Sequence, residues 1–261
     1  MSISFKEDHI SQIPALLMLE KLGYTYLTPD EALALRGGSV ANVVLESILR
    51  ERIAAINVVQ VSSTRTTVFS EQNITAGIEA LRNIPMDEGF MEASHTVYDL
   101  LTFGKTLEQI VDGDRKSFVM QYIDWKDIRN NVFHVTEEFA VSRTGMTDTY
   151  RPDIVLFVNG IPLCVIECKR PDVKDSIEQA ISQHLRNQKA DGIRSLYLYS
   201  TLLLAINRQE GSYATTATPE KFWARWREQF TDREEEARYR QELERVVNEP
   251  LLDDKLFGER F

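Results

Sequence analysis

Apolar residues recur at helical spacing through most of the first hundred residues of the chain. Apolar positions at i, i+3 and i+4 indicate a helix that buries one face. Glycine marks the breaks between these segments, at Gly23 and again at Gly37-Gly38, where Ser39 can cap the next helix. Four helices are predicted, over residues 10–22, 40–56, 73–82 and 88–103.

The hydrophobic pattern changes after residues 112–114, where β-branched and aromatic residues become frequent, as is typical of strands. Asn159-Gly160 separates two apolar runs and is a strong local signal for a hairpin. Strands are predicted over 118–123, 132–141, 153–158, 161–169, 196–199 and 202–207, and a further helix over 172–190. This order of helices and strands predicts an α/β fold with a mixed sheet flanked by helices.

The segment from Pro219 onward differs in composition, because twelve of the twenty residues over 226–245 are charged. Trp223, Trp226 and Phe230 have the spacing i, i+3, i+7, which predicts a helix with one aromatic stripe. Two interpretations are open. The aromatic stripe packs on the chain's own domain, or the helix is a connector that docks onto a structure outside this chain. We divide the chain into a domain over 1–215, with a helical insertion over about 40–103, and a helical connector over 219–261.

Composition and charge narrow the class of protein. The 261 residues are 43% apolar and 27% charged, which are ordinary values for a globular protein with a buried core. The net charge of −10 argues against a uniformly basic nucleic-acid-binding surface but is compatible with a local basic patch. The short apolar run at 13–19 follows Glu7 and Asp8, which is the pattern of neither a signal peptide nor a membrane span. We therefore expect a soluble, cytoplasmic protein.

The chain has two cysteines, Cys164 and Cys168, both in a predicted strand. Four strand residues span about 13 Å. Disulfide partners need Cα atoms within about 7 Å. We therefore expect no bond between the two cysteines, which favours a reducing compartment. The four histidines are scattered singly, so neither a structural zinc site nor a Ser-His-Asp arrangement is predicted.

The residues that best fit a catalytic role lie on the predicted hairpin. Asp153 follows Pro152 at the start of its first strand, and Glu167-Cys168-Lys169 ends its second. This pattern fits the PD-(D/E)xK signature of Mg²⁺-dependent nucleases. Two carboxylates can hold a hard cation, and a lysine can orient or deprotonate water and offset charge in the phosphoryl transition state. Alternation along a strand puts Glu167 and Lys169 on one face.

The short motifs alone, Pro-Asp and an acidic residue two positions before a lysine, are weak evidence for a nuclease site. Five of the ten lysines have an acidic residue two positions earlier, and Pro-Asp occurs three times, at Asp30, Asp153 and Asp172. Only Asp153, with Glu167 and Lys169, lies on two apolar runs joined by a hairpin turn. Ionisable groups at the end of a buried strand carry a desolvation cost that a function would explain. The alternative is a strand end that simply emerges into solvent.

Hairpin geometry provides a test of this assignment. Directly opposed residues of an antiparallel pair share a face. A regular two-residue turn pairs Asp153 with Ile166 and puts the two carboxylates on opposite faces. An odd-length connection, or a bulge near Pro162, pairs Asp153 with Glu167 instead, and proline favours it because it cannot donate to the ladder. We predict such an irregularity.

Local charge and the following helix also bear on the site. Residues 151–194 carry seven basic and six acidic side chains, a local charge of +1 against −11 for the rest of the chain, and this balance favours contact with phosphate. Gln179, Gln183 and Asn187 form a polar stripe at i, i+4 and i+8. From the pattern alone, a solvated helix face is the favoured explanation of this stripe.

The sequence resembles the N-terminal region of the R (restriction, HsdR) subunit of type I restriction-modification enzymes over roughly residues 7–230. The segments that carry the resemblance are 14–24, 98–102, 132–138, 151–171 and 222–223. The resemblance implies a Mg²⁺-dependent endonuclease domain with a PD-(D/E)xK, restriction-endonuclease-like core that cuts double-stranded, unmethylated foreign DNA. It also implies a two-lobed ATP-dependent translocase in the same polypeptide, and a complex with methyltransferase (M) and specificity (S) subunits.

The resemblance assigns roles to the hairpin residues by position. Asp153 and Glu167 are the implied metal ligands and catalytic carboxylates, and Lys169 is the implied catalytic lysine.

Three further elements of the family have candidates in this chain. Many relatives have a Gln-x-x-x-Tyr element on the next helix that affects DNA handling. Gln183 matches its first position, whereas Asn187 replaces the tyrosine. Arg170 is another candidate for DNA handling. Relatives of this nuclease fold often add an acid from the first helix, for which Glu7 or Asp8 is the candidate here.

Two other functions remain open: a stand-alone DNA repair nuclease or resolvase of the same fold, and a non-catalytic docking module. The aromatic segment over 219–261 argues against the first, and the intact acid–acid–lysine set argues against the second. Gly104-Lys105-Thr106 lacks the first glycine of a phosphate-binding loop, so ATP is expected to serve only a motor absent from this chain. We accordingly expect the chain to be a fragment of a larger subunit.

Overall fold

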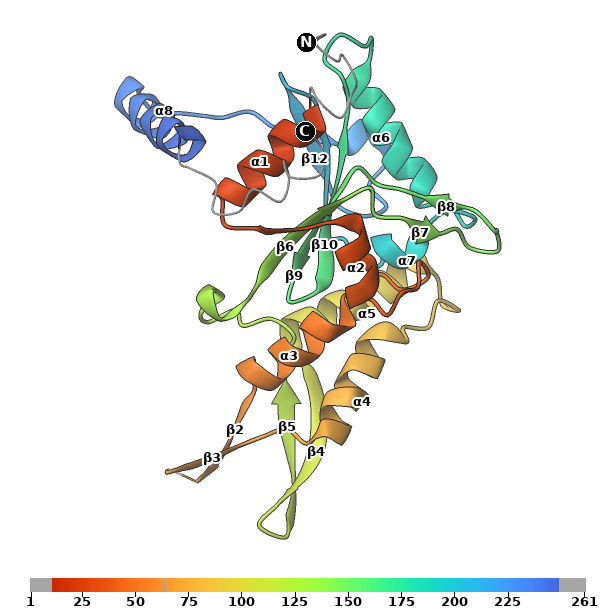
Figure 1. Cartoon of the computed structure of the whole chain (residues 1–261), viewed down its shortest axis with the longest axis vertical. Coiled ribbons are helices and arrows are strands. Elements are labelled where there is room, and N and C mark those ends of the chain that lie inside the picture. Colours follow the sequence, from red (N-terminus) through yellow and green to blue (C-terminus); the bar gives the residue numbers. More distant parts are fainter. Residues whose placement is uncertain (1–10, 63, 249–261) are drawn as a thin grey trace.

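A mixed seven-stranded sheet forms the centre of the computed structural model, which describes residues 11–62 and 64–248 (Figure 1). Its strands, in spatial order, are β1 (Thr25–Leu27), β6 (Phe133–Glu137), β9 (Ile154–Val158), β10 (Ile161–Cys168), β11 (Leu202–Ile206), β12 (Gly211–Ala214) and β13 (Ala224–Arg225). The pairs β1–β6 and β10–β11 are parallel and the others are antiparallel. The predicted α/β architecture with a mixed sheet is confirmed.

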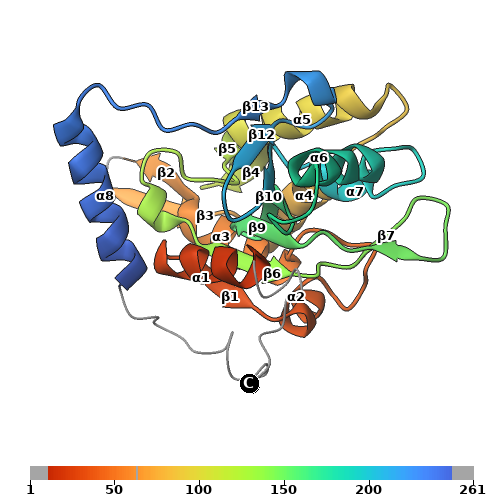
Figure 2. The same cartoon turned by 90° about the horizontal axis from the view of Figure 1, so that it is seen from above.

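Helices cover both faces of this sheet. α1 (Ile13–Lys21) packs on one face, where Leu16 joins a cluster that includes Ile166 of β10. α6 (Ser176–Asn187) packs on the other face, where Ile177 and Ile181 join Ala205 of β11. Figure 2 shows the two helices on opposite sides of β9 and β10. Because successive strand residues point to opposite faces, β10 contributes side chains to both cores.

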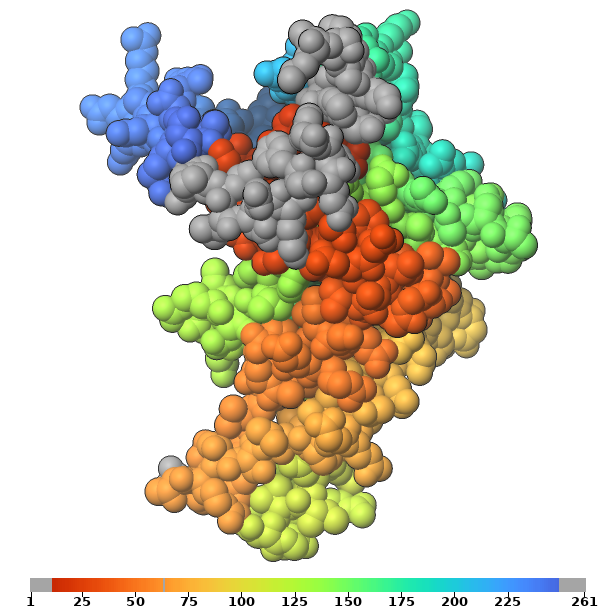
Figure 3. Space-filling model, viewed as in Figure 1, coloured from red at the N-terminus to blue at the C-terminus, as the bar shows by residue number. Residues whose placement is uncertain are grey.

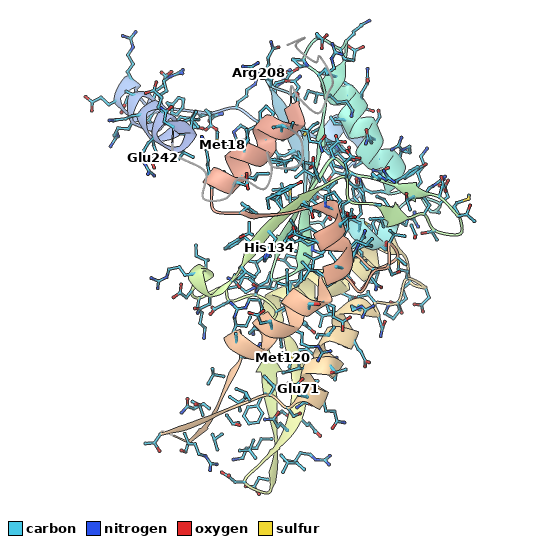
Figure 4. All side chains as sticks on the ribbon, viewed as in Figure 1. Met18, Glu71, Met120, His134, Arg208 and Glu242 are labelled. Atoms are coloured by element: carbon cyan, nitrogen blue, oxygen red, sulfur yellow. The ribbon has the colours of Figure 1, made fainter. Side chains whose placement is uncertain are left out.

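A long insertion between β1 and β6 extends away from the sheet. We call residues 46–120 the arm, which forms the lower end of the molecule in Figures 1 and 3. Its elements are α3 (Glu46–Ile56), β2 (Val58–Ser62), β3 (Arg65–Val68), α4 (Glu71–Arg82), α5 (Phe90–Phe103), β4 (Lys105–Val111) and β5 (Asp114–Met120). Met120, labelled in Figure 4, is fully buried at the base of the arm. The arm is thus packed onto the same core that supports the sheet.

Seven shorter or peripheral elements complete the described chain. α2 (Pro29–Leu35) follows β1 and begins with a capping box formed by Thr28 and Glu31. The others are the short hairpin β7 (Val141–Ser142) and β8 (Thr149–Tyr150), α7 (Arg194–Tyr197) and α8 (Arg233–Asn248), together with the 3₁₀ turns Ile128–Asn130 and Glu220–Phe222.

Several sequence predictions hold closely. The helices predicted over 10–22, 73–82 and 88–103 are found as α1, α4 and α5, and the strand predicted over 202–207 as β11. The helix predicted over 172–190 is found as α6, but it begins four residues later, at Ser176, and ends three residues earlier, at Asn187. The predicted hairpin turn is also present, with positive φ at both Asn159 and Gly160. Cys164 and Cys168 are buried thiols and not disulfide partners, as expected for two cysteines in one strand.

The helix predicted over 40–56 is wrong at its start, because α3 begins only at Glu46. The preceding backbone bonds to distant segments instead of to itself: Ser142 N–H donates to the Val40 carbonyl, and Leu45 N–H donates to the Gly160 carbonyl at 2.8 Å. Tertiary hydrogen bonds therefore override the helical pattern of these six residues.

The strand predicted over 196–199 is wrong, because α7 occupies Arg194–Tyr197 and its helical hydrogen bonding continues to Leu198. The four apolar residues of this run are all buried, so no face periodicity distinguishes a buried helix from a buried strand.

The helix predicted to carry Trp223, Trp226 and Phe230 on one stripe is also wrong. β13 occupies Ala224–Arg225 and pairs with β12, which makes β13 the edge strand of the sheet. Trp223 contacts His184, whereas Trp226 contacts Tyr213, so the aromatic side chains pack in different places. A helix does follow, but α8 begins only at Arg233.

The strands β1, β2, β3 and β4 were not anticipated, and the strand predicted over 118–123 ends at Met120 and starts four residues earlier as β5. The insertion is therefore less helical than its sequence pattern indicates. Among the described residues, no helix is both long and apolar enough to cross a membrane.

Candidate active site

The β9–β10 hairpin contains the predicted irregularity. Its register shifts directly after Pro162, and beyond the shift Ile166 pairs with Ile154. Continuing this register by one residue sets Glu167 opposite Asp153. Opposed residues share a face of the sheet. The predicted bulge is therefore confirmed, and it brings the two carboxylates to the same side.

Lys169 completes a compact group with these carboxylates. Its Nζ lies 3.9 Å from Asp153 Oδ2 and donates to the Cys168 carbonyl at 2.9 Å. The same Asp153 oxygen accepts a hydrogen bond from the Cys168 N–H at 2.6 Å, which ties the start of β9 to the end of β10. The side chains of Lys169 and Asp153 are only 15% and 17% exposed. The structure thus brings together all three residues that the sequence singled out.

Glu167 is the most buried member of the group, with 0% of its surface exposed. Burial raises the pKa of Glu167 well above its usual range, and the like charge of Asp153 and a hydrogen bond with Asp153 raise it further. Lys169 and Arg186 act in the opposite direction. A cation between the two carboxylates would relieve this repulsion.

Two side chains of α6 hold the Glu167 carboxylate in place. Gln183 Nε2 donates to Oε2 at 2.5 Å, and Asn187 Nδ2 donates to Oε1 at 3.3 Å. The solvated-face explanation of the polar stripe is therefore wrong for these two residues. It holds only for Gln179, which is exposed and donates to the Lys174 carbonyl.

An open hollow of about 430 Å³ lies beside the group, along α6. Lys169, Gln183 and Arg186 line it. Arg170, the other residue considered for DNA handling, forms an ion pair with Asp172 in its own turn. The hollow gives a substrate a route to Lys169 from the α6 side of the sheet.

A second buried carboxylate lies on the opposite face of the sheet and was not singled out from the sequence. Glu137 accepts hydrogen bonds from Tyr26 Oη at 2.6 Å and from Gln12 Nε2 at 3.0 Å. Gln12 Nε2 also donates to the Asp153 carbonyl at 3.1 Å, so this cluster supports the backbone of the site. The candidate acids at positions 7 and 8 lie outside the described residues.

The donor set of the site fits a hard divalent cation. Asp153 and Glu167 offer oxygen atoms side by side, and Mg²⁺ is usually bound by one or two carboxylates, with waters and substrate phosphate completing its shell. Within 11–62 and 64–248, no group of three or more His, Cys, Asp or Glu side chains could hold a metal ion. This donor set is poor for zinc, which prefers four nitrogen or sulfur ligands.

Sequence reasoning also missed His184 and Tyr197, which lie behind Asn187. His184 is one of four histidines scattered singly in the sequence, and Tyr197 lies in the segment predicted as a strand. The periodicity of α6 could have indicated His184, because it shares the buried face with Ile177 and Ile181.

Comparisons with known proteins identify the family of the chain. The family model "Type I restriction enzyme R protein N terminus" matches residues 4–222. A Haemophilus influenzae protein, the type I restriction enzyme HindI endonuclease subunit, is 29% identical over 206 residues, which are 76% of this chain and 18% of that protein. A Methanocaldococcus jannaschii protein, whose name assigns it to the endonuclease subunit of type I enzyme MjaIXP, is 27% identical over 226 residues, covering 84% of this chain and 20% of that protein.

These alignments mean that the chain spans about a fifth of the length of the curated relatives it matches. The family match itself covers most of the chain, including both strands of the site hairpin and all of α6. The chain therefore belongs to the family of type I restriction enzyme R protein N termini.

Proposed function

We propose that the chain is a Mg²⁺-dependent endonuclease domain with a PD-(D/E)xK core, which hydrolyses phosphodiester bonds of double-stranded DNA within a type I restriction enzyme. The observation that carries this proposal is the bulged hairpin, which opposes Asp153 to Glu167 and leaves Lys169 Nζ 3.9 Å from Asp153. The family membership and the names of the relatives support a restriction endonuclease.

The two carboxylates and the lysine have separate roles in this proposal. Asp153 and Glu167 would hold Mg²⁺, which supplies charge neutralisation at the phosphate and an activated water when bound. Lys169 lies at the edge of the hollow, where its ammonium can orient the attacking water and offset negative charge on the phosphoryl group. Gln183 and Asn187 keep the Glu167 carboxylate aimed at the site.

The burial of the carboxylates favours this function over a docking role. A fully buried Glu167 next to Asp153 costs free energy in folding, because like charges and burial both disfavour the ionised pair. A docking surface gains nothing from such a pair, whereas a metal site requires it.

The remaining parts of the proposal follow from the family. The domain would occupy residues 1–215, and residues 219–261 would lead to an ATP-dependent motor elsewhere in the subunit. The partners would be double-stranded DNA and the methyltransferase and specificity subunits, in the cytoplasm. Unmethylated foreign DNA would be the substrate.

Plasmid cleavage by the reconstituted complex tests the proposal. The whole R subunit is compared with its Lys169→Ala variant in the presence of ATP and Mg²⁺, and cleavage and ATP hydrolysis are measured separately. Lys174→Ala is the matched control, because the Lys174 side chain is 92% exposed and does not line the hollow. We expect Lys169→Ala to abolish cleavage and to leave ATP hydrolysis intact, and Lys174→Ala to retain both. Cleavage by Lys169→Ala at the wild-type rate would contradict the nuclease assignment and favour the docking module.

A further inference from the structure

A line of buried polar side chains continues behind Glu167, away from the hollow. His184, Asn187 and Tyr197 each have 0% of their surface exposed. Asn187 Nδ2 lies 3.4 Å from Tyr197 Oη, which lies 2.9 Å from His184 Nδ1. His184 Nε2 lies 3.0 Å from the Leu204 carbonyl oxygen on β11. These contacts connect the carboxylate to the sheet backbone through three side chains.

The Leu204 carbonyl at the far end of this line determines which atom donates in each of its hydrogen bonds. A carbonyl oxygen only accepts, so His184 Nε2 must carry a proton and donate to Leu204. Burial lowers the pKa of His184 to about 4, so the ring is neutral near pH 7 and its Nδ1 can only accept. Tyr197 must therefore donate its hydroxyl proton to His184. Its oxygen is then left to accept from Asn187.

The same logic fixes the orientation of the Asn187 amide. Its Nδ2 carries two protons, one directed to Glu167 Oε1 and the other to Tyr197 Oη. Its Oδ1 faces Arg186, which donates from Nη2 at 3.1 Å. A flipped amide would set Oδ1 against the Glu167 carboxylate and the Tyr197 oxygen, and it would set Nδ2 against the guanidinium. The hydroxyl of Tyr197, together with the Arg186 guanidinium, thus favours the amide orientation that presents a donor to Glu167.

We propose that Tyr197 is a positioning residue for the Glu167 carboxylate, acting through the amide of Asn187. The inference rests on the proposed function, because it assigns Glu167 the role of a metal ligand. Tyr197 contacts neither metal nor DNA in this proposal. It acts by keeping one Glu167 oxygen bonded to Asn187, while Gln183 holds the other. The carboxylate is thereby pre-oriented, and its rotation does not have to be restricted when the cation binds.

The test is Mn²⁺ binding to the 261-residue chain, measured by calorimetry, with thermal unfolding as a check of the fold. Tyr197→Phe removes only the hydroxyl. We expect the Mn²⁺ dissociation constant to rise about fivefold, as expected for the loss of a hydrogen bond worth about 1 kcal/mol. Tyr199→Phe is the matched control. Tyr199 is also buried, but its hydroxyl donates to the Leu81 carbonyl, which is not part of the line of contacts behind Glu167. This control should bind Mn²⁺ as the wild type does.

A double-mutant cycle separates positioning from a general structural effect. Asn187→Ala removes the side chain that connects the hydroxyl to the carboxylate, and we expect it to weaken Mn²⁺ binding at least as much as Tyr197→Phe. In the Asn187→Ala background, Tyr197→Phe should then weaken binding no further. Additive effects of the two substitutions would overturn the inference.

One more variant distinguishes failure of the inference from failure of the proposed function. Asp153→Asn removes one of the two proposed metal ligands. If Asp153→Asn loses Mn²⁺ binding while Tyr197→Phe binds as the wild type does, the positioning role is wrong and the metal site stands. If the wild type binds Mn²⁺ no better than Asp153→Asn, the proposed metal site is wrong, and the inference is wrong with it.

Discussion

Burial decides the chemistry of individual residues around the site. Glu167 and His184 are both fully buried, and in each case burial disfavours the charged form. The carboxylate therefore has a raised pKa and the imidazole a lowered one. The His184 ring packs at a tilt against Trp223, with ring centroids 5.3 Å apart, and is hydrogen bonded at both nitrogens, which leaves no room for hydration. Because the His184 ring is neutral, its Nδ1 accepts the Tyr197 hydroxyl proton, and the Tyr197 oxygen accepts from Asn187.

This environment predicts how His184 affects stability. The pKa of about 4 in the folded chain is below the ordinary value of 6.5, so the unfolded chain takes up a proton that the folded chain does not. Above pH 6.5, the contribution of the neutral His184 ring to the free energy of unfolding is fully present. As the pH falls from 6.5 to 4, the free energy of unfolding decreases by about 3 kcal/mol, because only the unfolded chain takes up this proton. NMR titration of the His184 ring should show a midpoint near 4. A midpoint near 6.5 would show that the ring is hydrated.

The β9–β10 hairpin positions the site at the level of secondary structure. Its turn residue Gly160 has a φ of +82°, and a Cβ there would lie 2.5 Å from the Leu45 carbonyl oxygen. The turn is thus pressed against the start of α3, to which it is also hydrogen bonded. The hairpin and the arm consequently depend on each other.

Gly160→Ala tests this close approach, with Gly145→Ala as its control. Gly145 also has a positive φ, of +71°, but a Cβ there meets nothing within 4 Å. Gly145→Ala should cost only the backbone strain, about 1 kcal/mol of unfolding free energy. Gly160→Ala should cost at least about 2 kcal/mol more, because α3 must move. Urea unfolding measures the difference, and equal costs would mean that the turn and α3 do not constrain each other.

Local signals made the hairpin predictable from sequence. Asn159-Gly160 sets the turn, Pro162 favours the bulge, and together they determine that Asp153 opposes Glu167. By contrast, β1 and β13 are three and two residues long and exist only because β6 and β12 offer free edges. No local pattern identifies such strands, since their hydrogen bonds are made with segments distant in sequence.

The site itself was predictable only in part, for the same reason. Asp153, Glu167 and Lys169 lie on two neighbouring strands, so strand alternation and one bulge relate them. Tyr197 reaches Asn187 from α7, which the sequence assigned as a strand, and Gln12 reaches Asp153 from the start of the chain. Contacts of this kind depend on how whole elements pack, which the hydrophobic pattern does not determine.

At the scale of the whole molecule, the site and the arm occupy different parts of one core. The sheet carries the site at the ends of β9 and β10, while the arm extends from the opposite end of the molecule (Figure 1). α8 is unlike the other long helices, because none of its residues is buried, and Figure 4 shows side chains such as Glu242 spread around it. The described chain therefore combines a well-packed site with two peripheral elements whose surfaces remain exposed.

Glu167→Gln in the whole R subunit tests whether the proposed nuclease site needs the Glu167 carboxylate. Glutamine keeps the size of the side chain and can accept the Gln183 hydrogen bond, but it cannot supply a negative charge to a cation. The substitution removes a buried charge but sets the new amide nitrogen against the Asn187 Nδ2 donor, so the melting temperature of the 261-residue chain is measured as a check of the fold.

Plasmid cleavage by the reconstituted complex is the measurement, with ATP and Mg²⁺ present. We expect Glu167→Gln to lower the cleavage rate about a hundredfold or more. ATP hydrolysis should continue at the wild-type rate. Wild-type cleavage by this variant would contradict the claim that the Glu167 carboxylate serves a nuclease site.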